Sequence, residues 1–229
     1  MSPLSRSVRD ALARAGRPLV RALIRGRVTP GALATVGFLA ACGAAVAFAA
    51  GRVRLGGLLL FFAASVALLG GEVQRQEGAS TAFDVFYAST LDRMGEAAVL
   101  AGVALFFLQG GVPPSRVTVA VGLTLAAMAA SYLASYTRAR AEALGVECAV
   151  GIVRRSERLL AFGAAALALG AGREGRLLVW IVALVTLATA ITVTQRLVHA
   201  ARTTHGPAVR VSRPRATLPG HSAARRKGH

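Results

Sequence analysis

Five of the ten acidic residues crowd into residues 70–96, a segment that lies between two apolar runs of the chain. They are Glu72, Glu77, Asp84, Asp92 and Glu96. Asp84, Asp92 and Glu96 fall on one helical face, because spacings of eight and four residues return to the same side of a helix. Carboxylate oxygens are the ligands that hard divalent cations prefer, and ionisable groups at membrane depth are costly. This segment is therefore the first candidate for a functional site.

A second polar stretch, residues 135–158, contains five arginines together with acidic residues. The arginines are Arg138, Arg140, Arg154, Arg155 and Arg158, and Glu142 and Glu157 lie on the helix ends beside them. A guanidinium group presents a planar fork of donors that matches phosphate oxygens. One interpretation is therefore a pocket for a phosphate-bearing molecule. The other is an ordinary arginine-rich loop on the cytoplasmic side of a membrane.

The elements that must position these residues are apolar segments of membrane-spanning length. Hydrophobic residues make up 55% of the 229-residue chain, and about 20 consecutive apolar residues span a bilayer. Six candidate helices are expected near residues 31–50, 56–76, 82–109, 117–144, 159–171 and 177–198. The fifth is short, and alone it would also suit a re-entrant segment or a buried helix. The expected fold is an all-α integral membrane protein, a bundle of six transmembrane helices.

The distribution of positive charge predicts how this bundle is oriented. With six spans, 20 of the 27 Lys and Arg residues fall on one side, which places both termini in the cytoplasm and the protein in the inner membrane. Residues 1–27 are arginine-rich and amphipathic, as in a juxtamembrane helix lying on an anionic leaflet. Residues 28–200 form the predicted membrane domain. The basic, proline-containing residues 201–229 form a predicted disordered tail.

Composition also argues against other classes of protein. The net charge of +17 could suggest nucleic-acid binding, but the charges lie in the tails and a few short loops, so no nucleic-acid partner is expected. Cys42 and Cys148 lie in different segments, which indicates neither a zinc site nor a disulfide framework. A small transporter remains an alternative, although the polar residues gather at the cytoplasmic ends and no inverted repeat is evident.

The acidic segment resembles the signature of the CDP-alcohol phosphatidyltransferases, D-x2-D-G-x2-A-R-x8-G-x3-D-x3-D. Gly71, Arg75 and the final aspartate, Asp92, match that pattern. The departures are Ala67, Gly70 and Ala88 in place of the first three aspartates, Asp84 in place of the second glycine, and Gln74 in place of the alanine. The resemblance implies that Gly71, Arg75 and Asp84 contact the nucleotide or the lipid.

The run YTRARAEALG, which begins at Tyr136, and the later GIVRRSER are similar to the bacterial phosphatidylinositol-phosphate synthase branch of that family. By this resemblance, Arg138, Arg155 and Arg196 would line a pocket for the phosphate of the acceptor. The resemblance covers about residues 28–200. It also implies membrane lipids as surroundings and a homodimer as the assembly.

The family moves a phosphatidyl group from CDP-diacylglycerol to an alcohol such as inositol phosphate and releases CMP. The resemblance implies Mg2+ or Mn2+ held by aspartates, with Asp92 as the candidate base. Asp84 and Asp92 could form a rebuilt metal site, with Glu72 as a possible third ligand. Alternatively, Asp84 and Asp92 pair with Arg75, Arg93 or Arg196 and only hold helices together. The protein would then be a silent homologue that binds lipid or nucleotide, or serves as a partner subunit.

Overall fold

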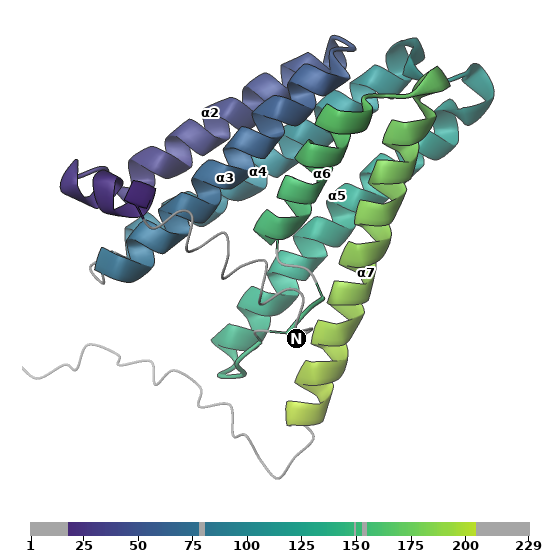
Figure 1. Cartoon of the computed structure of the whole chain (residues 1–229). Helices are drawn as coiled ribbons and strands as arrows, with labels where there is room; N and C mark the ends of the chain where they lie inside the picture. The colour runs from purple at the N-terminus through teal and green to yellow at the C-terminus, as the bar shows by residue number, and fades with distance from the viewer. Residues whose placement is uncertain (1–17, 78–80, 149, 153–154, 205–229) are drawn as a thin grey trace, which may run out of the picture.

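The computed structural model describes residues 18–77, 81–148, 150–152 and 155–204, and the chain is helical throughout these ranges apart from turns and loops. The long helices are α2 (Pro30–Ala49), α3 (Val53–Glu77), α4 (Ala82–Phe106), α5 (Pro114–Ala143), α6 (Arg155–Leu169) and α7 (Arg176–Thr204). A π-helical turn, η1 (Phe107–Gly111), follows α4, and a 3-10 turn, η2 (Arg173–Gly175), precedes α7. The predicted all-α fold class is confirmed over the described residues (Figure 1).

The two predicted terminal segments are described only in part. Residues 1–17 of the predicted juxtamembrane helix lie outside the described residues, whereas residues 18–25 are helical. In that short helix Val20 is buried in a cluster with Leu33 of α2 and Val66 and Val73 of α3. The predicted tail lies outside the described residues from residue 205 onward. Residues 201–204, which the sequence assigned to the tail, belong instead to α7.

Four helical segments are long and apolar enough to cross a membrane. They are Pro30–Ala49, Val53–Gln76, Pro114–Ala143 and Arg173–Thr203. The sequence explains why the other two long helices, α4 and α6, are not among these four segments. α4 carries Asp84, Asp92, Arg93 and Glu96, and α6 has only 15 residues. The structure thus supports a helical membrane protein with four such segments by length and composition.

Local capping fixes where the helices begin. The Thr29 hydroxyl accepts a hydrogen bond from the Ala32 backbone N–H at 3.2 Å, and Pro30 occupies the first turn. Both residue types favour a helix N-terminus, so α2 begins one residue before the helix expected near residues 31–50. α4 begins with a capping box in which the side chains of Thr81 and Asp84 each accept the backbone N–H of the other.

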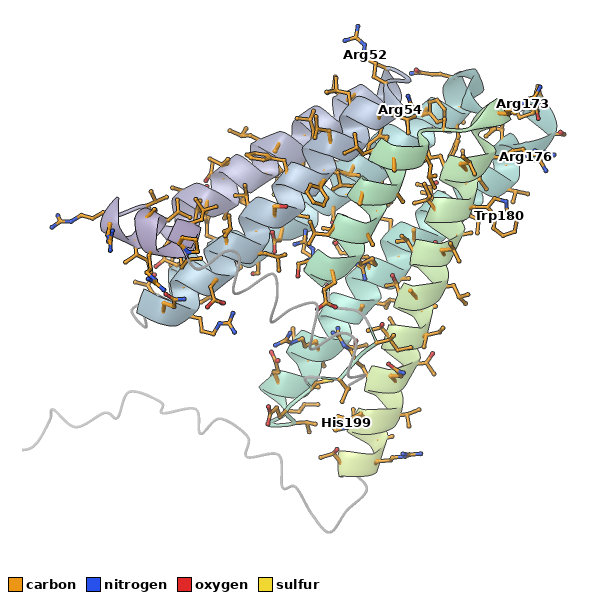
Figure 2. All side chains as sticks on the ribbon, in the orientation of Figure 1. Arg52, Arg54, Arg173, Arg176, Trp180 and His199 are labelled. Atoms are coloured by element: carbon orange, nitrogen blue, oxygen red, sulfur yellow. The ribbon has the colours of Figure 1, made fainter. Side chains whose placement is uncertain are left out.

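The helices pack as two groups that separate toward one end (Figure 1). In the first group α2 packs on both α3 and α4, and α3 packs on α6; in the second, α5 packs on α7. α4 contacts α5 and α6 contacts α7, which joins the two groups. Figure 2 shows Arg52, Arg54, Arg173 and Arg176 at one end of the bundle and His199 at the other.

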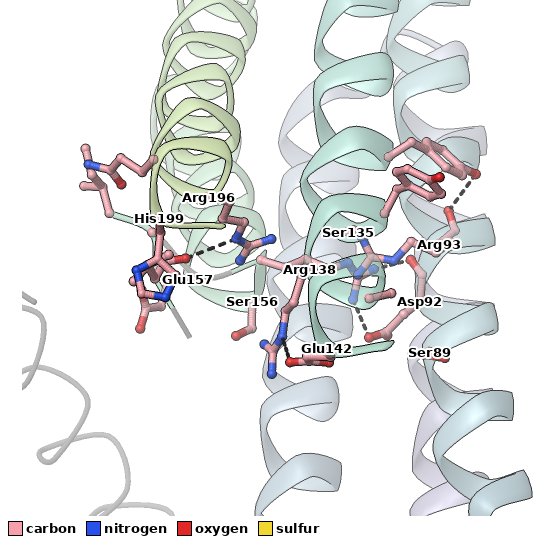
Figure 3. A pocket seen from close by; sticks show the side chains of 18 of the residues that line it. Ser89, Asp92, Arg93, Ser135, Arg138, Glu142, Ser156, Glu157, Arg196 and His199 are labelled. Carbon is pink, nitrogen blue, oxygen red and sulfur yellow. Dashed lines mark hydrogen bonds and ion pairs between the residues drawn. The ribbon is translucent and has the colours of Figure 1, made fainter. Parts of the chain in front are cut away.

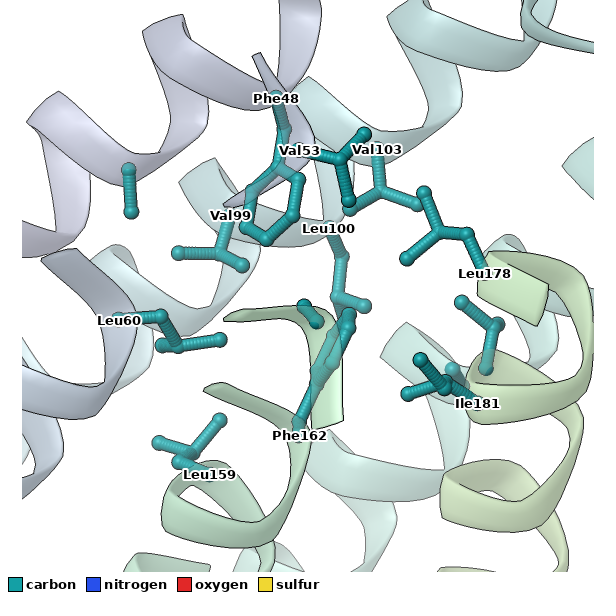
Figure 4. Packing of buried hydrophobic residues seen from close by; sticks show 14 of the residues in the cluster. Phe48, Val53, Leu60, Val99, Leu100, Val103, Leu159, Phe162, Leu178 and Ile181 are labelled. Atoms are coloured by element: carbon teal, nitrogen blue, oxygen red, sulfur yellow. The ribbon is translucent and has the colours of Figure 1, made fainter. Parts of the chain in front are cut away.

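The main hydrophobic core joins both groups near the end that carries Arg52 and Arg173 (Figure 4). The rings of Phe48 and Phe162 stack there with their centroids 5.9 Å apart, and both side chains are fully buried. Leu178 of α7 belongs to the same cluster. Because this core closes one end of the bundle, the opposite end is where the helices can separate.

Glycines let two helix pairs approach more closely than any side chain would permit. A Cβ atom on Gly57 of α3 would lie 2.8 Å from the Gly163 carbonyl oxygen of α6. A Cβ atom on Gly102 of α4 would lie 2.7 Å from Ala45 Cα and would overlap the Ala45 carbonyl oxygen of α2. Small residues have this role in membrane bundles, where close packing replaces the hydrophobic effect between helices.

Gly102→Ala should therefore destabilise the bundle, whereas Gly122→Ala should not. The Gly102 methyl group would meet the α2 backbone, and overpacking of this kind costs roughly 1–3 kcal/mol. Gly122 also lies in a helix, but a Cβ atom there meets nothing within 4 Å. Thermal unfolding of both variants in the same detergent measures the difference. Equal melting temperatures for the two variants would contradict the close α2–α4 crossing.

Candidate functional site

A cavity of about 1750 Å³ lies between α4, α5, α6 and α7 and is lined by polar side chains. Among its lining residues are Ser89, Asp92, Arg93, Ser135, Arg138, Glu142, Arg155, Ser156, Glu157, Gln195, Arg196, His199 and Arg202. Figure 3 shows side chains of α4, α5 and α7 around this one space. Its other walls include Phe86, Met94, Tyr132 and Tyr136, so the cavity has an apolar side as well.

A buried carboxylate, Glu96, joins α4 to α5 and α6 beside this cavity. Its side chain is only 5% exposed. Oε1 accepts hydrogen bonds from Arg158 Nη2 and from the Ser131 hydroxyl, both at 2.6 Å, and Oε2 accepts one from Arg155 Nε at 2.9 Å. Arg93 Nη1 lies 3.5 Å from Oε2. A charge this deeply buried is stable only when it is paired and hydrogen-bonded, and Glu96 meets both conditions.

Asp92, the candidate base, lines the cavity one helical turn before Glu96 and is also paired. Its Oδ2 lies 2.5 Å from Arg155 Nη1, and Arg155 Nη2 donates to the Asp92 carbonyl oxygen. One of the two alternatives from the sequence paired this carboxylate with Arg75, Arg93 or Arg196. The Asp92 ion pair is made instead by an arginine of α6, Arg155.

All three arginines predicted for the acceptor pocket line the cavity. Arg138 Nε donates to Glu142 Oε1 at 2.8 Å, and that pair is about half exposed. Arg196 Nε donates to the Val150 carbonyl oxygen at 3.1 Å, and its Nη1 donates to the carbonyl oxygen of Ala134. Arg155 differs from the other two because its guanidinium is bound by Asp92 and Glu96. Their role in binding an acceptor stays a prediction.

The three residues predicted to contact the nucleotide or the lipid do not line the cavity. Arg75 is exposed and pairs with Glu72. Gly71 has open space where a side chain would be. The Asp84 carboxylate accepts hydrogen bonds from the Thr81 backbone N–H at 3.0 Å and from the Thr81 hydroxyl at 2.7 Å. Asp84 therefore caps α4 and does not meet Asp92.

The residues present do not fit a divalent metal site. Ala67, Gly70 and Ala88 offer no side-chain oxygen. Of the two candidate metal ligands, Asp84 is bound to Thr81 and Asp92 to Arg155. Within the described residues, no group of three His, Cys, Asp or Glu side chains could hold a metal ion. Since Mg2+ requires several oxygen ligands in near-octahedral geometry, this donor set does not supply a site for it.

Sequence reasoning missed two members of the Glu96 network. Ser131 gave no signal, since it is one of many small residues on an apolar helix. Arg158 was counted with the loop arginines, although it begins the apolar part of α6 and is 5% exposed. The spacing of Arg155 and Arg158 by three residues does place them on one helical face. That spacing was the available signal for a shared partner.

Comparison with known proteins identifies relatives of this chain in sequence and in fold. No family model matches the chain. The phosphatidylinositol phosphate synthase of Cutibacterium acnes is 35% identical over 202 residues, which cover 85% of this chain and 96% of that protein. The archaetidylinositol phosphate synthase of Methanothermobacter thermautotrophicus is 36% identical over 159 residues, covering 66% of this chain and 75% of that protein.

A solved structure shares the fold. The Mycobacterium tuberculosis phosphatidylinositol phosphate synthase with CDP-DAG bound superposes with a TM-score of 0.67 and 28% identity, covering 82% of this chain and 94% of that one. The same enzyme in complex with manganese and citrate gives a TM-score of 0.67, covering 80% and 88% of the two chains. The chain therefore belongs to the CDP-alcohol phosphatidyltransferase family, as its sequence motifs indicated.

Replacement of Arg158 by Met should destabilise the protein strongly, whereas Arg138→Met should have little effect. Removing one partner of a buried ion pair typically costs about 3–5 kcal/mol, and the Arg158–Glu96 pair is 6% and 5% exposed. The Arg138–Glu142 pair is 54% and 46% exposed, and such pairs contribute about 0–1 kcal/mol. Unfolding of both variants in the same detergent measures the difference, and similar losses would show that Glu96 does not depend on Arg158.

Proposed function

We propose that this chain is a membrane protein of phospholipid biosynthesis that handles CDP-diacylglycerol and a phosphorylated polyol such as inositol phosphate. The observation that carries the proposal is the cavity in which Arg138, Arg155 and Arg196 gather beside Asp92. The named activity of the similar proteins, phosphatidylinositol phosphate synthesis, supports the same pair of ligands. Binding of CDP-diacylglycerol together with a phosphorylated polyol implies phosphatidyl transfer as the activity.

The arginines suit a ligand that carries a phosphate group. The guanidinium of Arg138 is about half exposed, and only Nε is engaged in the hydrogen bonds described for it. Arg196 donates to two backbone carbonyl oxygens, so these contacts leave its positive charge without a carboxylate. Charge-assisted hydrogen bonds from guanidinium groups to phosphate are among the stronger polar contacts in proteins. Ser135, Thr194 and Gln195 offer further polar groups for polyol hydroxyls.

We further propose that metal-dependent transfer by this chain is very weak. Mg2+ or Mn2+ would be the cofactor of an active enzyme, and a manganese complex of a similar enzyme supports that role in the family. Asp92 alone remains of the four aspartates in the family pattern. Loss of groups that only support metal ligands typically costs 10–100-fold, and this chain lacks three of the ligands themselves.

A second candidate function is a silent homologue that binds the lipid or nucleotide, or serves as a partner subunit, without turnover. The observation that favours it is the ion pair between Asp92 and Arg155. A base must be free to reach the proton of the attacking hydroxyl group, whereas Asp92 Oδ2 lies 2.5 Å from Arg155 Nη1. Asp92 would then act as a structural residue.

The proposed setting is the inner membrane, with six spans, both termini in the cytoplasm and the cavity open to that side. In this arrangement α4 and α6 are spans in addition to the four segments that qualify by length and composition. The shared position of Arg52, Arg54, Arg173 and Arg176 at the end opposite His199 supports it (Figure 2). A homodimer is proposed from the family resemblance.

An assay for CMP release separates the two candidate functions. The purified protein in detergent receives CDP-diacylglycerol, inositol phosphate and either Mg2+ or Mn2+. We expect little or no CMP, because positions 67, 70 and 88 lack metal ligands. A variant with Ala67→Asp, Gly70→Asp and Ala88→Asp, made with and without Asp84→Gly, should gain activity. Both versions are needed because Asp84 caps α4, and loss of a cap costs about 1 kcal/mol.

Robust CMP release by the unmodified protein would contradict weak transfer. Asp84→Asn then decides whether a rebuilt metal site is responsible, since only such a site would lose activity with that change. Activity that appears only in the restored variant favours the silent homologue, because the missing metal ligands then account for the lack of turnover. Thermal unfolding of each variant confirms that inactive proteins are folded.

Cysteine labelling tests the proposed topology. Cys42 and Cys148 are first replaced by Ala, and single cysteines are then placed at Arg52, Arg173 and Arg202. In intact cells an impermeant maleimide should label positions 52 and 173 from outside, because the positive-inside rule places these ends away from the cytoplasm. Position 202 should react only after lysis. Labelling of position 202 in intact cells, or protection of 52 and 173, would contradict six spans with cytoplasmic termini.

A further inference from the structure

Arg155 bridges the two carboxylates that remain near the floor of the cavity. Its Nη1 lies 2.5 Å from Asp92 Oδ2 and its Nε lies 2.9 Å from Glu96 Oε2. We propose that this guanidinium is the resident cation of the site, so that the cavity binds the phosphate of its ligand without a divalent metal. The identity of the ligand rests on the proposed function, whereas the role of Arg155 rests on the geometry.

The charges around Arg155 are already balanced by the protein itself. Asp92 and Glu96 supply two negative charges, and Arg155 and Arg158 supply two positive charges within ion-pair distance. Arg93 adds a third positive charge 3.5 Å from Glu96. A divalent cation at Asp92 would therefore lie beside a guanidinium group and meet a net positive site. Charge repulsion at such short range is strong away from bulk water.

The donors on the α3 side of Asp92 are also too few for a divalent cation. Ala67 and Asp92 both line the large cavity, and both line a smaller one of about 30 Å³. Ala67 offers no side-chain oxygen, and the Asp92 carboxylate is already paired with Arg155. Mg2+ gives up its water reluctantly and requires near-octahedral oxygen ligands. The space between α3 and Asp92 thus offers Mg2+ a single carboxylate that is already paired.

The large cavity keeps positive charge for an anionic ligand. Its lining includes Arg93, Arg138, Arg155, Arg196 and Arg202 against three acids, Asp92, Glu142 and Glu157. Arg155 is committed to the carboxylates, whereas the hydrogen bonds described for Arg196 go to backbone carbonyl oxygens. Arg196 is therefore the positive charge that a phosphate group can use. In this arrangement one arginine neutralises the site and another binds the ligand.

Two measurements on the purified full chain in detergent test the inference. Electron paramagnetic resonance of added Mn2+ reports the bound fraction, and we expect none above an empty-detergent control. Binding of inositol phosphate, followed by thermal shift, should be the same in EDTA as in Mn2+. Arg196→Gln should weaken that binding by roughly 10–100-fold, the value of one charge-assisted hydrogen bond.

Matched variants then examine Arg155 directly. Arg155→Gln releases both Asp92 Oδ2 and Glu96 Oε2, and the amide oxygen of the new Gln is a third donor. This variant should therefore bind Mn2+, which the natural chain does not. Arg138→Gln is the matched control, because it removes an arginine of the same cavity. The hydrogen bond and ion pair described for Arg138 go to Glu142, not to Asp92 or Glu96. The Arg138→Gln variant should therefore bind no Mn2+. If Arg155→Gln does not fold, the Mn2+ titration of the natural chain still decides the question.

Two results would overturn the inference. One is Mn2+ bound by the natural chain and lost in Asp92→Asn, which would make Asp92 a metal ligand. The other is binding of inositol phosphate that EDTA abolishes. If inositol phosphate binds under neither condition, the proposed ligand and the proposed function are wrong. The Mn2+ titrations of the natural chain and of Arg155→Gln, compared with each other, then show whether Arg155 excludes the metal.

Discussion

The burial of Glu96 is the constraint on which the arrangement of α4, α5 and α6 depends. A carboxylate at 5% exposure would be strongly destabilising without partners. The side chains that donate hydrogen bonds to it come from fixed positions on the neighbouring helices α5 and α6. Ser131 sets the register of α5 against α4, and Arg155 with Arg158 sets that of α6. The apolar core cannot specify these registers as sharply, because dispersion contacts are not directional.

The Glu96 network and the apolar core stabilise different parts of the bundle. The core around Phe48, Phe162 and Leu178 closes the end that carries Arg173. Beyond Glu96, toward His199, the helices separate and polar side chains line the space that opens. The network lies at the boundary and supplies the cavity with a rigid floor. Ligand contacts made by residues above that floor would therefore meet a preorganised surface, which reduces the cost of binding.

The sequence predicted the six long helices and the residues of the cavity better than it predicted their pairing. Apolar runs located the helices, and the positions of Arg138, Arg155 and Arg196 in one cavity agree with the motifs. The sequence did not identify Arg155 as the partner of Asp92. Arg155 lies 63 residues further along the chain, and hydrophobic periodicity does not indicate which helices are neighbours. Asp84 was proposed as a metal ligand because it shares a helical face with Asp92. The local Thr-x-x-Asp spacing instead predicts the capping box that the structure contains.

The fold does not depend on the three aspartates of the family pattern that this chain lacks. Four carboxylates close together need cations, because unpaired buried negative charges repel one another and lose their hydration. Ala67, Gly70 and Ala88 remove that need together, and the one remaining aspartate is neutralised by Arg155. A single replacement would instead have left a partly filled metal site. Asp92 consequently has a structural reason to be an aspartate whether or not the protein turns over substrate, since without it Arg155 would lose one of its two carboxylates.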